Sequence, residues 1–485
     1  MNVAAPLTLH TRFRAEHPAI VHGDRVLRYR ELDPLVRRTA SHLCDLGLKQ
    51  GDAVGLALRD SVEHIVMLMA LARAGLVIVP LDWRWTPEEQ ERVARHFAAR
   101  LVLVEPDRPR PALRCMALDA EWQAAVARAD AQRAFPEGGE LPLCMSLSSG
   151  TTGRPKGPRH MHANFLARFR VFCVNLGFNA QDRYLSATPL YFGGGRSFAM
   201  FTLHIGATLY LFPPPYEPEA LCREIARTRA TALFLVPTII RRLLALSDAA
   251  LAPLGHLRLL VSSGSALHAE ERREIRRRLC RGFMEYYSST EGGGVSTLTA
   301  EDPPQFDESV GRPVFAVEVE CVDENHRPVP PGEIGRIRYR GPGTATGYWN
   351  DPEASREAFH DGWFYPGDLG MLDEHGYLYI KGRAKDMIIR GGVNIYPAEV
   401  EAVLQSHPAV ADSAVVGWPS REFNEEVAAF VILKQRVAAD ELRTLCRERL
   451  APYKVPREVF VVDEFPRNTL GKVLKTELSG RLPQL

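Results

Sequence analysis

Residues 52–105, DAVGLALRDSVEHIVMLMALARAGLVIVPLDWRWTPEEQERVARHFAARLVLVE, alternate between two hydrophobic patterns and decide the fold class. Short apolar runs, typical of buried strands in a parallel sheet, stand at 52–58, 76–80 and 100–105. Between them, 61–75 and 86–99 have helical apolar spacing, and the second segment begins with Thr86 as a candidate N-cap. This order predicts β-α-β-α-β, a parallel sheet with helices on its faces.

The same alternation returns in the middle of the chain and then stops. Strands are predicted at 207–212, 231–237 and 257–264, with helices around 217–228 and 238–247. No GxGxxG follows the first strand, so the sequence gives no support for a dinucleotide-binding first half. After about residue 310, alternation with period two, broken by Pro, Gly and Asn, predicts antiparallel strands. From Tyr396 onward, mixed helix and strand signals predict a small α+β domain.

Composition narrows the class of protein. The chain has 485 residues and a net charge of +1, which argues against a general nucleic-acid surface. The Arg-rich run 271–281 is interspersed with acids and apolar residues, as expected for a solvated helix face. Eight scattered cysteines form no CxxC pair, which favours reduced thiols in a cytoplasmic protein. The N-terminus has no signal-peptide pattern, and the longest apolar stretch, 198–212, is too short for a membrane span and contains His204.

The loop SLSSGTTGRPKG, residues 146–157, is a candidate anion site. It does not fit the spacing of the common nucleotide loop, G-x-x-x-x-G-K-[ST], so an ATPase or GTPase of that class is not supported. A Gly-rich backbone can still turn its N–H groups inward, while hydroxyls and one lysine add donors and charge. The competing interpretation is a flexible surface linker, which the proline and the single lysine make weaker.

This loop resembles the phosphate loop of the adenylate-forming superfamily, which includes acyl-CoA synthetases, peptide-synthetase adenylation domains and luciferases. Further segments resemble that family in the expected order: YYSSTEGGG (286–294), GWFYPGDLG (362–370), KGRAKDMIIRGGVNIYPAEVE (381–401) and PRNTLGKVLK (466–475). The resemblance covers nearly the whole chain. The segment 381–401 is more similar to acyl-CoA synthetases than to peptide-synthetase domains.

The resemblance implies a fold and a reaction. Residues 1–384 would form a large adenylation domain of two parallel-sheet α/β subdomains and a distorted antiparallel β-barrel. Residues 386–485 would form a small, mobile α+β domain that rotates about a hinge at Lys385. A carboxylic acid and ATP, with Mg²⁺, would give an acyl-adenylate and pyrophosphate. The thiol of coenzyme A would then displace AMP.

The resemblance also assigns catalytic and nucleotide-binding roles. Two anions, the carboxylate and the α-phosphate, must meet, so cations are needed at the reacting centre. Lys472 matches the family's catalytic lysine, Glu291 its magnesium ligand, and Thr290 a donor to the α-phosphate. The implied ATP-binding residues are Ser148, Thr151, Thr152, Lys156, Ser265, Ala266, Tyr287, Asp368 and Arg383. Within this set the loop residues would hold the β- and γ-phosphates, Tyr287 would stack on adenine and Asp368 would bind the ribose.

Acyl and thiol sites follow from the same resemblance. Gly391 and Gly392 would let a pantetheine arm reach the adenylate. The implied acyl-pocket residues are Tyr191, Phe192, Gly193, Arg196 and Ser288. Two of these depart from the family: Phe192 replaces a frequent histidine, and Ser288 replaces a glycine. We expect Ser288 to narrow the pocket, which favours a short, compact or planar acid.

Two questions stay open at the level of sequence. Arg196 could pair with a distal polar group of the substrate, although a structural role is the better interpretation. The thiol acceptor could be coenzyme A or the pantetheine of a carrier protein, because both present the same group. A non-catalytic protein that binds nucleotide or acyl ligand is a third alternative, disfavoured because Thr290, Glu291, Asp368 and Lys472 are all present. A homodimer is compatible with the sequence.

Overall fold

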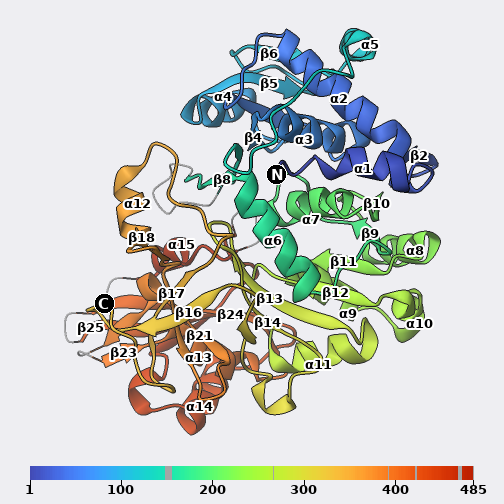
Figure 1. Cartoon of the computed structure of the whole chain (residues 1–485). Coiled ribbons are helices and arrows are strands. Elements are labelled where there is room, and N and C mark those ends of the chain that lie inside the picture. The colour runs from blue at the N-terminus through green and yellow to red at the C-terminus, as the bar shows by residue number, and fades with distance from the viewer. Residues whose placement is uncertain (148–155, 266, 391–392, 421–422, 468–471, 484–485) are drawn as a thin grey trace. The chain divides into compact units, whose positions relative to one another are not determined.

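The computed structural model of the chain describes residues 1–485 except 148–155, 266, 391–392, 421–422, 468–471 and 484–485 (Figure 1). The described residues form two compact units. Unit one comprises Met1–Val319 with Tyr339–Phe364, and unit two comprises Glu320–Arg338 with Tyr365–Leu485. The predicted functional boundary at Lys385 concerns motion between catalytic states and stays a prediction.

A six-stranded sheet in unit one contains the segment that opened the sequence analysis. Its order is β6 (Cys115–Ala117), β5 (Ala99–Val104), β3 (Ala53–Ala57), β4 (Val77–Pro80), β7 (Pro142–Met145) and β8 (Arg159–Met161). All neighbours are parallel except β7 and β8, which are antiparallel. The strands and helices predicted for residues 52–105 are confirmed. Gly75 ends the first helix in a left-handed conformation, with φ of 68°.

A nine-stranded sheet forms the second α/β part of unit one. Its order is β15 (Arg312–Pro313), β14 (Gly293–Leu298), β13 (Phe283–Ser289), β12 (Leu259–Ser262), β11 (Ala232–Leu235), β9 (Arg183–Ser186), β10 (Thr208–Leu211), β1 (Pro18–His22) and β2 (Arg25–Arg28). The strands from β13 to β1 run parallel, so their carboxyl ends meet at one edge. A site at this edge is therefore expected on topological grounds.

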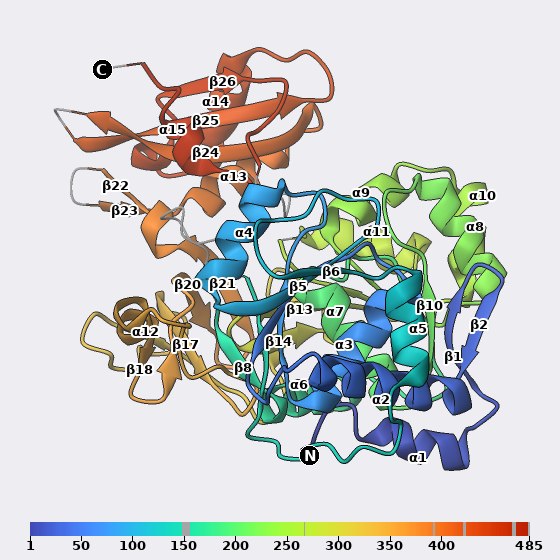
Figure 2. The same ribbon diagram turned by 90° about the horizontal axis from the view of Figure 1, so that it is seen from above.

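Helices cover both sheets (Figures 1 and 2). Those of unit one are α1 (Pro6–Phe13), α2 (Tyr29–Asp45), α3 (Val62–Ala74), α4 (Pro87–His96), α5 (Ala120–Arg128), α6 (His162–Val174), α7 (Gly193–His204), α8 (Pro218–Thr228), α9 (Pro237–Leu244), α10 (Asp248–Leu251), α11 (Ala269–Arg278) and α12 (Pro352–Ala358). Short 3-10 helices span Ala252–His256 and Pro304–Phe306.

Alternate strand residues explain the layers of unit one. Val54 and Leu56 of β3 enter one large core that also contains α2, α3, α6, α7 and one face of the nine-stranded sheet. Ala53 and Ala57, one position away, enter a separate core under α4. The other face of the nine-stranded sheet packs against α8, α9 and α11. Both parallel sheets are thus covered on two sides, as their continuous apolar strands require.

The antiparallel strands expected after residue 310 are present. Their order is β18 (Phe359–His360), β19 (Trp363–Phe364), β17 (Gly335–Arg340), β20 (Asp368–Leu372) and β21 (Leu378–Arg383), with β16 (Glu318–Val322) also paired to β17. In unit one Tyr339 pairs with Phe364, and in unit two β20 pairs with β21. A 3-10 helix, η3 (Ala384–Asp386), follows β21.

The small α+β fold expected near the C-terminus is also confirmed. Its sheet has the order β23 (Val393–Ile395), β22 (Ile388–Arg390), β25 (Asn424–Leu433) and β24 (Val410–Ser420), and β26 (Glu458–Val461) pairs with β25. Its helices are α13 (Pro397–Gln405), α14 (Ala439–Arg449) and α15 (Lys475–Ser479), with a 3-10 turn at Pro452–Lys454. One face of β24 and β25 packs on α13 and α14, the other on Phe465 and Leu478.

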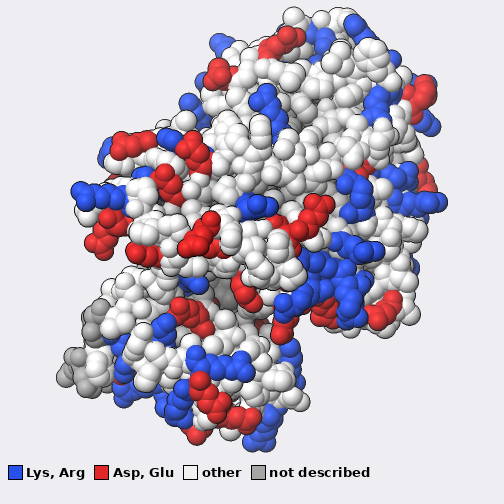
Figure 3. Space-filling model, turned by 60° about the horizontal axis from the view of Figure 1, so that its bottom comes forward, with Lys and Arg blue, Asp and Glu red and all other residues white. Residues whose placement is uncertain are grey.

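The arginine-rich helix α11 meets the expectation of a solvated face only in part. Arg273 and Arg277 are exposed, but Arg272 is buried against Glu285, and Arg276 and Arg278 are half-buried, 2.9 Å from Asp307 and 2.7 Å from Asp248. Figure 3 shows a gathering of Lys and Arg on one face, with Asp and Glu close beside it. The structure thus favours a mixed, solvated surface over an extended basic groove.

Candidate active site

The predicted phosphate loop begins after the carboxyl end of β7, which pairs with β4 in parallel. β7 ends at Met145, and β8 returns beside it as an antiparallel partner. At the base of the loop the Ser146 N–H donates to the carbonyl of Pro158, at 3.4 Å. The Trp349 N–H donates to the Gly157 carbonyl, at 2.9 Å, so a second segment borders the loop. The predicted phosphate ligands Ser148, Thr151 and Thr152 lie outside the described residues.

A three-residue chain joins the loop lysine to the predicted magnesium ligand. The Lys156 ammonium lies over the ring of Tyr348, 5.4 Å from its centroid. The Tyr348 hydroxyl donates to Oε1 of Glu291, at 3.0 Å. Lys156 and Glu291 are 135 positions apart in the sequence numbering, yet one aromatic side chain contacts both. Unit one therefore brings together the lysine predicted to bind phosphate and the carboxylate predicted to bind magnesium.

Glu291 fits a divalent cation. Its side chain is buried, and in the described part of the chain it forms no ion pair with Lys or Arg. One carboxylate oxygen accepts from Tyr348, and a hard cation prefers such oxygen ligands. Among the described residues, no group of three or more His, Cys, Asp and Glu side chains could hold a metal. A magnesium ion here would combine Glu291 with phosphate oxygens of its substrate, as this ion commonly does.

The turn that carries Thr290 and Glu291 requires glycine at positions that follow Glu291. It joins β13 to β14, and the Gly292 N–H donates to Ser289 Oγ at 2.8 Å. A Cβ at Gly292 would lie 2.2 Å from the Tyr339 ring, and one at Gly294 would lie 2.0 Å from the Tyr286 hydroxyl. The Gly run after Glu291 therefore lets the backbone pass between two buried tyrosines.

The predicted acyl-pocket residues lie at the carboxyl edge of the nine-stranded sheet. Tyr191 and Phe192 are in the turn between β9 and α7, and Ser288 is on β13. The Ser288 hydroxyl hydrogen-bonds to that of Ser263, at 2.9 Å, just beyond β12. Ser288 is thus tied to the neighbouring strand end and occupies space that a glycine would leave open.

Aromatic rings fill the interior beside this edge. Gly193 begins α7, and a Cβ at Gly194 would lie 2.8 Å from the ring of Phe234 on β11. Phe234 stacks on Phe198, with centroids 4.9 Å apart, and Phe198 stacks on Phe172 at 4.4 Å. The glycine allows the Phe234 ring to approach α7, and the stacked rings fill the interior between α7, β11 and α6.

Arg196 is buried and bonded to this chain's own groups. Only 1% of its surface is exposed. Its guanidinium donates to the carbonyls of Leu190 (3.3 Å) and Tyr191 (3.0 Å), and to Ser146 Oγ (3.3 Å). These contacts favour the structural interpretation of Arg196, because it links the Tyr191 turn to the base of the phosphate loop. Its place in the acyl pocket stays a prediction.

Asp60 and the Arg84–Asp82 ion pair also contact the Tyr191 turn. The Leu190 N–H donates to Asp60 Oδ1, at 2.9 Å, and burial raises the pKa of Asp60 to about 7. Arg84 forms an ion pair with Asp82, at 2.6 Å, and donates to the Tyr191 hydroxyl, also at 2.6 Å. Burial raises the pKa of Tyr191 to about 12, so its hydroxyl stays protonated at neutral pH.

Unit two gathers a second set of predicted residues. Asp368 on β20 and Arg383 on β21 are register partners, and the guanidinium donates to Asp368 Oδ1 at 2.9 Å. Desolvation lowers the pKa of Lys472, and the positive charge of Arg383 lowers it further, while Asp368 opposes the shift. The predicted catalytic lysine therefore interacts electrostatically with the predicted ribose ligand and its partner. Lys385 is exposed in η3, next to this group.

The remaining predicted residues are placed as follows. Ser265 is exposed just beyond β12, and Tyr287 is half-buried on β13. Ala266, Gly391 and Gly392 lie outside the described residues. Sequence reasoning missed Tyr348, Ser263, Phe234 and Arg168. Phe234 and Ser263 lie near the carboxyl ends of strands that the sequence predicts, so strand-end position was an available signal for both; Tyr348 and Arg168 gave none.

Two further observations concern the whole chain. All eight cysteines are free. Within the described residues, every helix is too short or too polar to cross a membrane.

Comparison with known families gives two matches. Residues 9–349 match the family described as AMP-binding enzyme. Residues 399–472 match the AMP-binding enzyme C-terminal domain. Glu291 and Lys156 fall in the first match, and Lys472 is the last residue of the second.

Individual relatives align over almost the full length. A 2-succinylbenzoate–CoA ligase of Geobacillus kaustophilus (strain HTA426) is 33% identical over 97% of this chain and 96% of its own. A feruloyl-CoA synthase of an Amycolatopsis species is 34% identical over 96% and 95%. The solved o-succinylbenzoate CoA synthetase of Bacillus subtilis, in complex with its acyl-adenylate intermediate, superposes with a TM-score of 0.89 at 28% identity, covering 98% and 97%. The same protein has been solved with ATP and a magnesium ion.

Proposed function

Because the chain belongs to the AMP-binding enzymes, in the acyl-CoA synthetase branch of the adenylate-forming superfamily, we propose that it is an ATP-dependent acid–thiol ligase. It activates a carboxylic acid as acyl-AMP, releases pyrophosphate, and transfers the acyl group to coenzyme A, giving acyl-CoA and AMP. The observation that supports this proposal is that Tyr348 contacts both Lys156, the predicted phosphate-binding lysine, and Glu291, the predicted metal ligand.

The first half-reaction requires that charge on the triphosphate be neutralised. Lys156 holds the outgoing phosphates, and the backbone and hydroxyl of Thr290 orient the α-phosphate. Glu291 holds the magnesium ion, which when bound neutralises phosphate charge and improves pyrophosphate as a leaving group. Lys472 binds between the carboxylate and the α-phosphate, where a cation reduces their repulsion. An oxygen of the acid attacks the α-phosphorus and the bond to pyrophosphate breaks.

Nucleotide specificity is assigned to the second group of residues. The Asp368 carboxylate accepts from the ribose hydroxyls, and Arg383 fixes its orientation, because the guanidinium already donates to one of its oxygens. Tyr287 and Ser265 border the adenine. In the second half-reaction, movement at Lys385 removes Lys472 and brings Gly391 and Gly392 to the thiol, whose sulfur attacks the acyl carbonyl and displaces AMP.

The acid is proposed to be compact or planar. The stacked rings of Phe172, Phe198 and Phe234 fill the interior behind the Tyr191 turn, and Ser288 is held against Ser263. The relatives described above take aromatic acids by their names, which supports the same class. Activity that rises with aliphatic chain length beyond about ten carbons would contradict this part of the proposal.

Coenzyme A is favoured over a carrier protein as the acceptor, because the relatives are CoA ligases. Loading of a carrier-protein pantetheine, association as a homodimer and a cytoplasmic location remain predictions. Binding without turnover is disfavoured by the presence of Glu291, Asp368 and Lys472.

The test is pyrophosphate release with a panel of short aliphatic, dicarboxylic and aromatic acids, with and without coenzyme A. We expect acid-dependent release with at least one compact or aromatic acid, and turnover that continues only when coenzyme A is present. Turnover with a pantetheine-loaded carrier protein but not with coenzyme A would support the alternative acceptor. Absence of release with every acid would favour a binding protein.

A further inference from the structure

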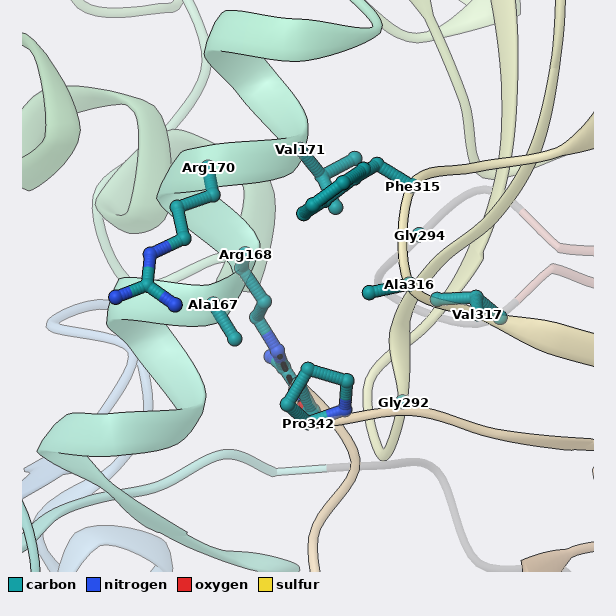
Figure 4. A pocket seen from close by; sticks show the side chains of 11 residues that line it. Ala167, Arg168, Arg170, Val171, Gly292, Gly294, Phe315, Ala316, Val317 and Pro342 are labelled. Carbon is teal, nitrogen blue, oxygen red and sulfur yellow. Dashed lines mark hydrogen bonds between the residues drawn. The ribbon is translucent and has the colours of Figure 1, made fainter.

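Arg168 of α6 is a buried cation directly behind the Thr290–Glu291 turn (Figure 4). Its guanidinium donates to three backbone carbonyls: Gly343 at 2.9 Å, Thr290 at 3.3 Å and Glu291 at 2.9 Å. It also lies 3.3 Å from Nδ1 of His160. One side chain thus joins α6, β8, the β13–β14 turn and the segment around Gly343.

The backbone around Arg168 is shaped to receive it. Gly293 has φ of 74°, and a Cβ there would lie 2.8 Å from Nε of Arg168. A Cβ at Gly343 would lie 3.1 Å from its Cγ. The Asn164 amide, from the same helix, donates to the carbonyls of Pro342 and Thr344, both at 3.0 Å. The Ala345 N–H donates to the Glu291 carbonyl, at 2.9 Å. Arg168 of α6 and the Ala345 N–H therefore both bind the Glu291 carbonyl, and Asn164 of α6 holds the segment next to Ala345.

The charge of Arg168 has no carboxylate at ion-pair distance among the described residues. Two other buried arginines of unit one have a carboxylate partner: Arg73 pairs with Asp33, at 2.5 Å, and Arg272 pairs with Glu285. Arg196 resembles Arg168, because it binds carbonyls and a hydroxyl instead. Burial lowers the pKa of Arg168 to about 10, so the group stays charged at neutral pH. Burial also holds the pKa of His160 well below its ordinary value, so its ring is neutral and can accept from the guanidinium. A buried charge that meets carbonyls and a neutral ring instead of a carboxylate is costly to fold. Two of those carbonyls belong to Thr290 and Glu291, so the contacts of Arg168 indicate a role in holding that turn.

We propose that Arg168 is a positioning residue for the magnesium ligand: it fixes the carbonyls of Thr290 and Glu291, and so the peptide from which the Glu291 carboxylate projects. This rests on the proposed function, because it takes Glu291 as the ligand. Groups that orient a metal ligand through a second contact commonly change metal affinity by about 10–100-fold when removed. The Tyr348 hydroxyl holds the side-chain end of the same residue, by donating to Oε1 of the Glu291 carboxylate.

The test compares Arg168→Met, which keeps volume and loses all donors, with Arg168→Lys, which keeps charge and one point of donation. The matched control is Arg170→Met, two residues along the same helix. The Arg170 side chain is exposed and lines, with Arg168 and Gly292, the small pocket drawn in Figure 4. ATP binding is measured by calorimetry over a Mg²⁺ titration, which reads the site without turnover. Pyrophosphate release over the same titration gives the activity.

We expect Arg168→Met to raise the Mg²⁺ concentration for half-maximal effect by about 10–100-fold, Arg168→Lys to lie between it and the wild type, and Arg170→Met to match the wild type. If folded Arg168→Met needs the same Mg²⁺ concentration for half-maximal effect as the wild type, the proposal is overturned. This holds even if its thermal stability falls, because lost stability reduces the amount of active protein and not its metal dependence. If Arg168→Met does not fold, wild-type Mg²⁺ dependence in Arg168→Lys decides against it. Wild-type protein that binds ATP without any Mg²⁺ dependence would instead reject Glu291 as the ligand, and with it that part of the proposed function.

Discussion

Removal of the Tyr348 hydroxyl tests the link between the phosphate loop and the metal ligand. Tyr348→Phe deletes the 3.0 Å hydrogen bond to Glu291 but keeps the ring over which the Lys156 ammonium lies. A cation over a phenylalanine ring retains its attraction, so Lys156 stays in place. Glu291 itself is unchanged and loses only the Tyr348 hydroxyl, which donates to one of its carboxylate oxygens.

The size of the effect follows from the type and burial of the bond. A hydrogen bond to a charged group contributes about 1.5–3 kcal/mol. Tyr348 is half-buried, so the lower part of that range applies, about 1.5–2 kcal/mol. At about 1.4 kcal/mol per tenfold, Mg²⁺ affinity should fall roughly 10- to 30-fold. The value of kcat at saturating Mg²⁺ should change much less.

The assay is acid-dependent pyrophosphate release over a Mg²⁺ titration at saturating ATP. Tyr379→Phe is the matched control, since the Tyr379 hydroxyl donates to Asp373 at 3.1 Å, the same kind of bond to a carboxylate that has no predicted role in the site. Its Mg²⁺ dependence should equal that of the wild type. A change below about twofold in folded Tyr348→Phe, or an equal change in the control, would refute the reasoning.

Other predictions concern the catalytic lysine, the hinge, the acyl pocket and a buried acid. Lys472→Ala should reduce adenylate formation by about 100- to 1,000-fold and largely spare thioester formation from supplied acyl-adenylate, whereas Lys385→Pro should do the reverse; equal damage to both half-reactions would contradict both assignments. Ser288→Gly removes the contact with Ser263 and should raise kcat/KM for bulkier acids by about tenfold, and an unchanged ranking in a homologous acid series would sink the pocket argument. Arg196→Ala should lower the melting temperature by leaving the Leu190 and Tyr191 carbonyls unpaired, with substrate ranking unchanged; a changed ranking would show that Arg196 contacts the acid. The pKa of Asp60 is raised to about 7, so its ionisation disfavours the folded state. As pH rises from about 4 to 7, the free energy of unfolding should fall by up to about 4 kcal/mol relative to Asp60→Asn. The same pH dependence of unfolding free energy in the two proteins would contradict this.

The sequence predicted those elements whose signal is local. The capping pattern predicts that a helix begins after Thr86. The structure confirms this start, and the Thr86 hydroxyl accepts from the Glu89 N–H. Strand β9 escaped prediction, yet it lies between β11 and β10 in the sheet. Strand order depends on crossovers and on long-range packing, which hydrophobic periodicity does not encode.

The glycines at 193–195 show how tertiary packing overrides propensity. Three consecutive glycines disfavour a helix, but α7 begins with them. A Cβ at Gly195 would lie 2.2 Å from the Pro189 carbonyl, and one at Gly194 would meet Phe234. Close approach therefore requires glycine there, and the packing of the rest of α7 maintains the helix.

The site was predicted where family motifs are contiguous and missed where contacts are distant. Glu291 and Lys156 were identified from motifs, whereas Tyr348, which contacts both, lies in a segment with no such pattern. Arg168 is one arginine among many on amphipathic helices, and only its burial and its carbonyl contacts distinguish it. Such residues act through geometry that a single sequence does not display.

The central claim, activation of a carboxylate through an adenylate, is tested most directly by following oxygen. The best acid from the panel is labelled with ¹⁸O in both carboxylate oxygens and converted with ATP and coenzyme A. Because a carboxylate oxygen attacks the α-phosphorus and stays there when the thiol displaces AMP, mass spectrometry should find one ¹⁸O in each AMP and none in pyrophosphate. Unlabelled AMP, or label in pyrophosphate or inorganic phosphate, would contradict the account.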